Sequence, residues 1–186
     1  MKILVLGPRV AALSADGDSW VLLNASPDIA RQIRSHPQLQ PRGEAVRSAP
    51  IRAVVLLDAQ IDHVIGLLGL RDGPAIDLHA TPSVFEDLTT GLPLLNVLQH
   101  YCGARWHMLP IAGERLRAEF RVGGFPSLRF TALAVPGRAP RYSPHRREQG
   151  AGDNIALLVE DLRDGRRLMV DDKFWEEEGA AMESTP

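Results

Sequence analysis

Cysteine is almost absent from this sequence. The one cysteine is Cys102, so the chain cannot form a disulfide within itself or build a zinc site from several thiolates. A lone thiol is typical of a reducing compartment, and we expect a cytoplasmic protein. The apolar run at residues 1–7 is too short for a signal-peptide core or a membrane span, and we interpret it as the first strand.

The sequence also has few aromatic residues and no excess of either charge. Aromatic residues make up 5% of the chain, and 21 Lys and Arg stand against 23 Asp and Glu, for a net charge of −2. Base-stacking platforms need aromatic rings, and binding to phosphate backbones or anionic lipids needs a basic surface. We therefore expect neither nucleic acid nor a membrane as a partner.

Three common functional motifs are missing as well. The sequence has no Gly-x-Gly-x-x-Gly, no phosphate-binding loop and no Gly-x-Ser-x-Gly. Nothing in it therefore supports a nucleotide cofactor or serine hydrolase chemistry.

The elements that are present predict one α/β (α+β) domain over residues 1–175, followed by an acidic tail at 176–186. Asp16-Gly17 and Asp164-Gly165 predict the turns of two hairpins, one near each end of the chain. Because strands pair in hairpins at both ends and helices separate others, we expect a mixed sheet with helices outside it. Strands are predicted at 2–6, 10–13, 20–23, 51–57, 76–80, 106–109, 118–122, 128–135, 154–160 and 166–171, and helices after Ser26-Pro27 and Thr81-Pro82 and at 61–70 and 92–101.

The strongest candidate for chemistry follows the apolar strand at 51–57. Asp58, Asp62 and His63 come within six residues of its end, and loops after strand ends are where α/β folds place their sites. Carboxylates with an imidazole suit iron, manganese or zinc. The alternative is that Asp58 or Asp62 caps the helix that begins near Ile61, with His63 packed on it.

Two other strand ends carry acidic residues that could reach the same edge. Asp28 follows Ser26-Pro27, where Ser26 is a candidate helix cap, and Asp171 ends the last predicted strand. The alternative for Asp28 is an ordinary Ser-Pro helix start, and for Asp171 a polar strand terminus.

The third candidate is the long polar loop at 136–153. His145 and Arg146 in this loop could receive an anionic substrate or a ligand. Long loops in compact domains are often functional, and the alternative is a solvated loop with no role in binding. The remaining histidines lack ligand-like neighbours in the sequence, and we expect surface or structural roles for them.

Several of these segments together resemble one family, the B proteins of pyrroloquinoline quinone (PQQ) biosynthesis. The resemblance covers most of the chain in order, through residues 1–7, 23–29, 57–68, 86–91, 142–146 and 152–155, with Asp171 at the family's Val-Asp-Gly aspartate. It implies a metallo-β-lactamase-like αββα sandwich with mixed sheets, in a shortened form. Asp62 and His63, with Asp171, would correspond to metal ligands, and Asp58 would be a catalytic neighbour.

The sequence departs from the family pattern at three places. Gly7 runs directly into Pro8, where the family has a Gly- and Cys-rich segment that holds a structural zinc. An extra family stretch is missing between Leu168 and Val170, and the histidine-bearing segments that complete the family's metal site are not found after Trp175. The resemblance therefore implies an incomplete set of metal ligands in these residues.

The resemblance implies a role in PQQ biosynthesis, with three alternatives for what the chain does there. The first is metal-dependent, iron-type hydroxylation of the tyrosine of a Glu–Tyr precursor, with iron or zinc as the divalent metal. The second is a carrier that binds or transports PQQ or its precursor, which the incomplete ligand set favours. The third is a metal-dependent hydrolase, although Asp58 and Gln60 stand where that superfamily has His-x-His. A small-molecule or dipeptide precursor is the expected partner, and a homodimer is a further prediction.

Overall fold

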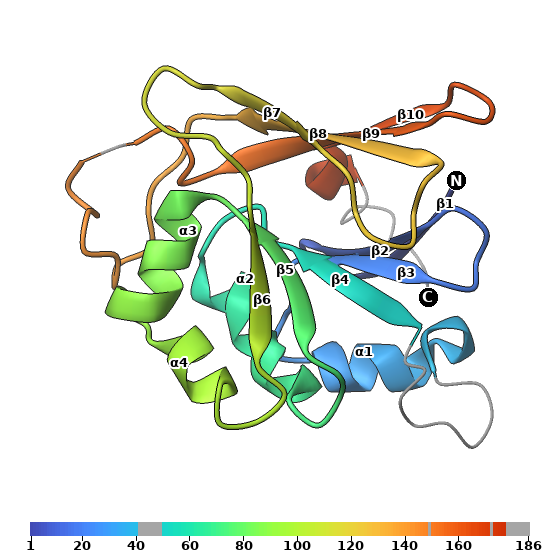
Figure 1. Ribbon diagram of the computed structural model, residues 1–186, viewed down its shortest axis with the longest axis horizontal. Helices are drawn as coiled ribbons and strands as arrows, with labels where there is room; N and C mark the ends of the chain where they lie inside the picture. The colour runs from blue at the N-terminus through green and yellow to red at the C-terminus, as the bar shows by residue number, and fades with distance from the viewer. Residues whose placement is uncertain (41–49, 149, 172, 178–186) are drawn as a thin grey trace.

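The computed structural model describes residues 1–40, 50–148, 150–171 and 173–177. Most of the predicted acidic tail lies outside the described residues. Within them the chain forms two β-sheets stacked face to face, with helices against the outer face of the first (Figure 1). The predicted mixed sheet with helices outside it is thus present, and a second, antiparallel sheet packs against it.

The first sheet has six strands in the order β1-β2-β3-β4-β5-β6. Its first three strands are antiparallel, and the pairs from β3 to β6 are parallel. The parallel strands alternate with helices along the chain, as crossover connections require. The strands are β1 Lys2–Gly7, β2 Val10–Ser14, β3 Trp20–Leu23, β4 Ile51–Val55, β5 Ile76–Ala80 and β6 Ala104–Met108.

The second sheet is antiparallel throughout, in the order β10-β9-β8-β7. Its strands alternate between apolar residues that face the first sheet and polar residues that face away, as a one-sided antiparallel sheet does. Phe130 and Leu157, for example, are fully buried between the sheets. The strands are β7 Arg117–Phe120, β8 Leu128–Ala134, β9 Ile155–Asp161 and β10 Arg167–Val170.

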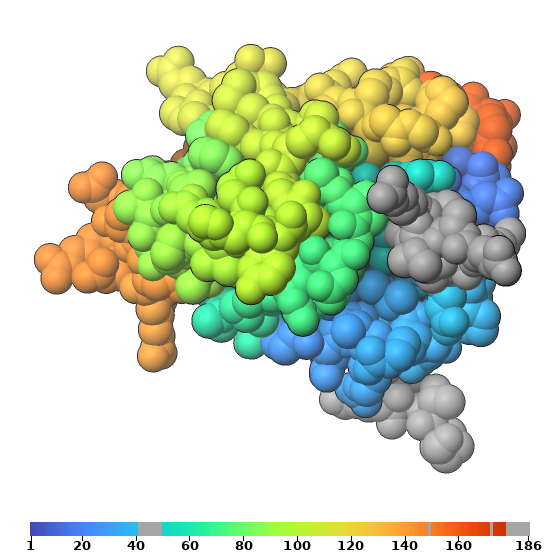
Figure 2. All heavy atoms as spheres, turned by 60° about the horizontal axis from the view of Figure 1, so that its bottom comes forward, coloured from blue at the N-terminus to red at the C-terminus, as the bar shows by residue number. Residues whose placement is uncertain are grey.

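Short helical segments cover the face of the first sheet that points away from the second, and Figure 2 shows the molecule from this side. Among the described residues, no helix is long and apolar enough to cross a membrane. The helical segments are α1 Ile29–Ser35, η1 Pro37–Leu39, α2 Ile61–Val64, η2 Ile65–Leu70, α3 Pro82–Glu86, η3 Asp87–Gly91 and α4 Leu94–Leu98.

Helix starts were predicted with mixed success. Thr81 caps α3 as expected, because its hydroxyl accepts a hydrogen bond from the Val84 amide at 3.3 Å. The prediction that Ser26 caps α1 is wrong: the N-cap is Asp28, and no side chain bonds the helix end there. The Ser26 hydroxyl instead donates to the side-chain oxygen of Gln32, at 3.0 Å in the interior.

The helix predicted at 61–70 forms, but only its first turn is an α-helix. The rest winds as a 3₁₀ helix, and the first of its two glycines, Gly66, lies against the β3–α1 junction. A Cβ built on Gly66 would meet the Ser26 carbonyl oxygen at 2.0 Å and the Ala25 carbonyl oxygen at 2.6 Å. The Gly66 amide donates to the Ala25 carbonyl at 3.0 Å, so this close approach fixes α2 and η2 against the end of β3.

His79 is a buried imidazole of the first sheet, and it gives the fold a predicted pH dependence. Its ring is 4% exposed and stacks on His107 with 4.7 Å between ring centroids. Burial lowers the pKa of His79 to about 4, and the neighbouring His107 adds to the effect. The unfolded chain, with a histidine pKa near 6.5, takes up the proton first, so folding stability is lost as the pH falls from about 6.5 towards about 4.

The variant His79→Gln tests this origin of the pH dependence. We expect the free energy of unfolding in urea to fall less in the variant than in the parent protein between about pH 7 and about pH 5. Equal losses in the two proteins would assign the pH dependence to other groups.

Candidate functional site

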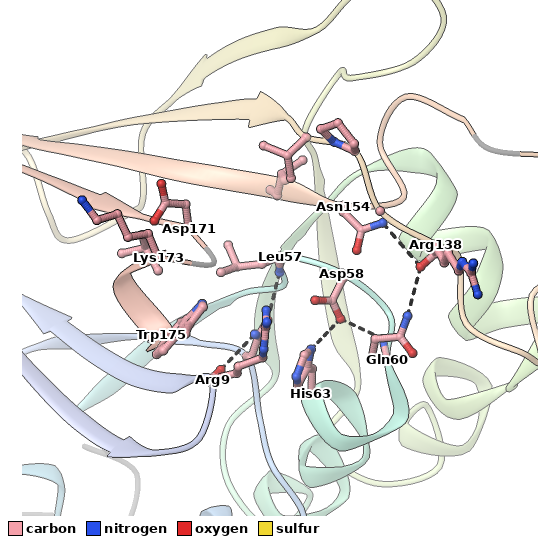
Figure 3. A pocket seen from close by; sticks show the side chains of 16 residues that line it. Arg9, Leu57, Asp58, Gln60, His63, Arg138, Asn154, Asp171, Lys173 and Trp175 are labelled. Atoms are coloured by element: carbon pink, nitrogen blue, oxygen red, sulfur yellow. Dashed lines mark hydrogen bonds and ion pairs between the residues drawn. The ribbon is translucent and has the colours of Figure 1, made fainter. Parts of the chain in front are cut away.

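A cavity of about 500 Å³ opens where β3, β4, β9 and β10 reach the same end of the two sheets (Figure 3). Two backbone contacts join the sheets there. The Ile155 amide donates to the Leu57 carbonyl at 2.8 Å, and Asp58 and Asn154 form an isolated antiparallel bridge. The residues that line the cavity are Arg9, Asn24, Leu57, Asp58, Gln60, His63, Val135, Pro136, Gly137, Arg138, Asn154, Ile155, Val170, Asp171, Lys173 and Trp175.

Asp58 and His63 form a close pair in the lining of this cavity, as Figure 3 shows. Asp58 Oδ1 lies 2.6 Å from His63 Nδ1, and the two side chains are 11% and 12% exposed. The same oxygen accepts the Gln60 amide at 2.8 Å. Because Nδ1 is bound to Asp58, Nε2 is the ring nitrogen through which His63 can bind a ligand or exchange a proton.

Neither acidic residue caps the helix that carries His63. The N-cap of α2 is Gln60, without a side-chain bond to the helix end. Asp58 instead turns the chain before the helix by accepting the Gln60 amide, which leaves its carboxylate close to the imidazole. The capping alternative for Asp58 and Asp62 is therefore wrong.

Asn24 connects two segments of the cavity lining, at Arg9 and at Leu57, a role that the sequence did not predict. Its side-chain oxygen accepts the Leu57 amide at 2.9 Å and its side-chain nitrogen donates to the Arg9 carbonyl at 3.0 Å. Both Asn24 and Arg9 have positive φ angles, of 61° and 54°. Asparagine is enriched in this left-handed region, and that preference was the one local signal available for Asn24.

The other predicted site residues are distributed unevenly around the cavity. Asp171 lines it, and its carboxylate accepts the Phe174 amide at 3.0 Å at the start of the helical turn at 173–177. Asp62 is exposed in the first turn of α2 and is not among the lining residues. The structure therefore brings His63 together with Asp58, with Asp171 on the same cavity, and leaves Asp62 on the outer side of the turn.

Three further predicted site residues lie away from the cavity. Asp28 is exposed and pairs with Arg31 at 3.1 Å, so the expectation that it reaches the site is wrong. His145 and Arg146 are also absent from the cavity lining. His145 instead binds Asp153, with 2.8 Å between Nε2 and Oδ1, and so holds its own loop in place.

The chain is similar to a defined group of known proteins. A family model described as "Beta-lactamase superfamily domain" matches residues 19–170. The Coenzyme PQQ synthesis protein B of Methylobacillus flagellatus is 51% identical over 156 residues, which is 83% of this chain and 50% of that protein. The protein of that name from Azotobacter vinelandii is 52% identical over 157 residues, 84% of this chain and 50% of its own length.

Solved structures agree with the sequence comparison. The crystal structure of Zn²⁺-bound PqqB from Methylobacterium extorquens superposes with a TM-score of 0.67 at 32% identity, over 86% of this chain and 50% of that one. Human tRNase Z, short form, matches with a TM-score of 0.54 at 13% identity, over 88% of this chain and 61% of that one, and shows the fold alone. The chain spans about half the length of the curated relatives that it matches.

Proposed function

The chain belongs to the beta-lactamase superfamily and is a homologue of the Coenzyme PQQ synthesis proteins B, and from this premise we propose that it acts in PQQ biosynthesis. The observation that carries the proposal is the Asp58–His63 pair in the lining of the cavity. A cavity of about 500 Å³ is within the size range of small-molecule sites. We propose that a small precursor, such as one with a Glu–Tyr unit, binds there.

A divalent ion, iron or zinc, is the cofactor that we propose. The zinc-bound relative supports it, as does the pair itself, because a carboxylate bound to one nitrogen of an imidazole commonly orients the other nitrogen towards a metal. The described residues, however, contain no group of three His, Cys, Asp or Glu side chains placed to hold a metal ion. Metal sites in proteins use about three or four ligands, so the described residues do not make up a complete site.

The finer proposal is metal-dependent hydroxylation of the precursor's tyrosine. A bound metal would supply the activation of dioxygen. The part this chain can play is to hold the precursor in the cavity and to orient His63 through Asp58. Because the described ligands are incomplete, we assign no reaction step to these residues.

The second candidate is a carrier of PQQ or its precursor, and the short ligand set favours it. A hydrolase of the metallo-β-lactamase type has less support, since Asp58 and Gln60 occupy the positions of its His-x-His pair. Both enzyme candidates need more metal ligands than the carrier does, so metal content and turnover separate the candidates.

The test uses the full chain, ferrous iron, dioxygen, a two-electron reductant that converts the second oxygen atom to water, and a Glu–Tyr dipeptide. Mass spectrometry follows the hydroxylated product, and calorimetry follows dipeptide binding without metal. Hydroxylated product supports the enzyme, whereas binding without product supports the carrier. If the chain shows neither product nor binding of the dipeptide or of PQQ, the proposed function is wrong.

A further inference from the structure

A second cluster of charged side chains lies outside the cavity, under the loop at 136–148. His145 stands between carboxylates from separate segments: Nε2 is 2.8 Å from Asp153 Oδ1, just before β9. Nδ1 faces Glu86 Oε2 of α3 at 3.8 Å and Asp87 Oδ1 of η3 at 3.9 Å. Asp87 and Asp153 are 0% and 2% exposed, so His145 connects the loop to two buried acids.

Two buried carboxylates make the net charge of this cluster depend on a proton. Neither carboxylate oxygen of Asp87 has a hydrogen-bond partner among the described residues. Burial raises the pKa of the Asp87 carboxyl, while the nearby Ser143 hydroxyl, which falls short of good hydrogen-bond geometry, and the charge of His145 lower it, and the charges of Asp153 and Glu86 add a smaller rise. With a proton on Asp87, the cluster avoids two uncompensated buried carboxylates. The nearby Arg146 is directed elsewhere, because its guanidinium donates to the Ser143 carbonyl.

The loop held by His145 is also a wall of the cavity. Gly137 and Arg138 line the cavity, and the Arg138 carbonyl accepts the Gln60 side-chain amide at 3.0 Å. Further along, the Tyr142 hydroxyl donates to the Ala59 carbonyl, next to Asp58. In Figures 1 and 2 the loop projects at the left edge of the molecule, and although Pro140 and Ser143 are buried, most of residues 144–148 are exposed. Loss of the His145 contacts with Asp87 and Asp153 would remove the support of the loop on the side that faces away from the cavity.

We propose that Asp87, His145 and Asp153 form a proton-controlled latch that keeps the loop at 136–148 closed over the cavity. While the buried Asp87 carboxyl holds a proton, Asp153 is the one buried carboxylate beside His145 and the loop stays in place. When the pH rises and Asp87 loses that proton, two buried carboxylates lie on either side of the ring, and their repulsion and desolvation favour an open loop. The proposal is independent of the chemistry at Asp58 and His63.

Trypsin cleavage at Arg141 and Arg146 measures loop opening, because a native segment must leave the surface before a protease can bind it. The cleavage rate at each pH is divided by the rate on unfolded chain at the same pH. We expect this ratio to rise with pH in the parent protein. Each unit by which the Asp87 pKa differs between the closed and the open loop should raise the ratio by up to about tenfold. Asp87→Asn removes one buried charge at constant shape, so its normalised rate should stay low across the pH range in which the parent rate rises. His145→Gln removes the imidazole that contacts both buried acids, and its loop should be cleaved rapidly at every pH.

The matched control is Asp164→Asn, which neutralises an exposed carboxylate bound to Arg166 in the β9–β10 turn. Its profile should equal that of the parent protein. The latch is overturned if the cleavage rate of the parent protein does not rise with pH. It is also overturned if the rise persists in Asp87→Asn, or if the control differs from the parent protein. If circular dichroism shows that Asp87→Asn does not fold, His145→Gln decides, and cleavage equal to the parent at every pH overturns the proposal.

Discussion

Replacing Asp58 with asparagine is expected to weaken zinc binding at the cavity by about tenfold to a hundredfold, the usual effect of losing a carboxylate that orients a metal-binding histidine. Asparagine can still accept the Gln60 amide, so the turn before α2 should keep its shape. What the variant loses is the negative charge 2.6 Å from His63 Nδ1. Calorimetric titration of the full chain with zinc chloride measures the change.

The matched variant is Asp62→Asn, four residues further on in the same turn. Sequence reasoning gave Asp62 the role of a metal ligand, whereas the structure leaves it exposed and outside the cavity lining. We expect zinc affinity in this variant to stay within about twofold of the parent, as for a substitution that touches no ligand. Strong loss in Asp62→Asn with little change in Asp58→Asn would restore the sequence-based assignment.

The largest expected effect on stability comes from Gly66→Ala. The added Cβ would lie 2.0 Å from the Ser26 carbonyl oxygen and 2.6 Å from the Ala25 carbonyl oxygen, and both are backbone atoms that cannot turn away. The two segments must separate, which also strains the 2.6 Å hydrogen bond from the Ala25 amide to the His63 carbonyl. We expect a loss of about 3 kcal/mol or more, at or above the upper end for overpacking.

Gly123→Ala is the control for this substitution, because a Cβ at Gly123 meets nothing within 4 Å. Chemical denaturation of both variants should show a large loss for Gly66→Ala and a change within about 0.5 kcal/mol for Gly123→Ala. Similar stabilities would mean that the approach of η2 to the β3–α1 junction is looser than the distances indicate.

Much of the architecture follows from the sequence because local signals agree with the fold. The Asp-Gly turns, the apolar run at 51–57 and the Thr81-Pro82 helix start all lie where the structure has them. The resemblance to PQQ synthesis proteins supplied the superfamily, which composition and periodicity alone did not.

The details of the site follow less well from the sequence, because they depend on contacts between distant segments. Which carboxylate reaches His63 is decided by the turn that Asp58 makes with the Gln60 amide. The clamp made by Asn24 joins Arg9 to Leu57, and the role of His145 depends on Asp87 and Asp153. The residue types predict that these side chains can bind a ligand or a metal. They do not predict which partners the fold brings to them.

The most direct measurement of the site is a zinc titration of the full chain, followed by nuclear magnetic resonance at the histidine rings and the aspartate carboxyl carbons. If the cavity at the end of β4 is where this protein binds its metal, the His63 and Asp58 signals will move together, and those of Asp62 will stay in place. Movement of the His63 and Asp62 signals with Asp58 unchanged, or no change at His63 at all, would contradict that assignment.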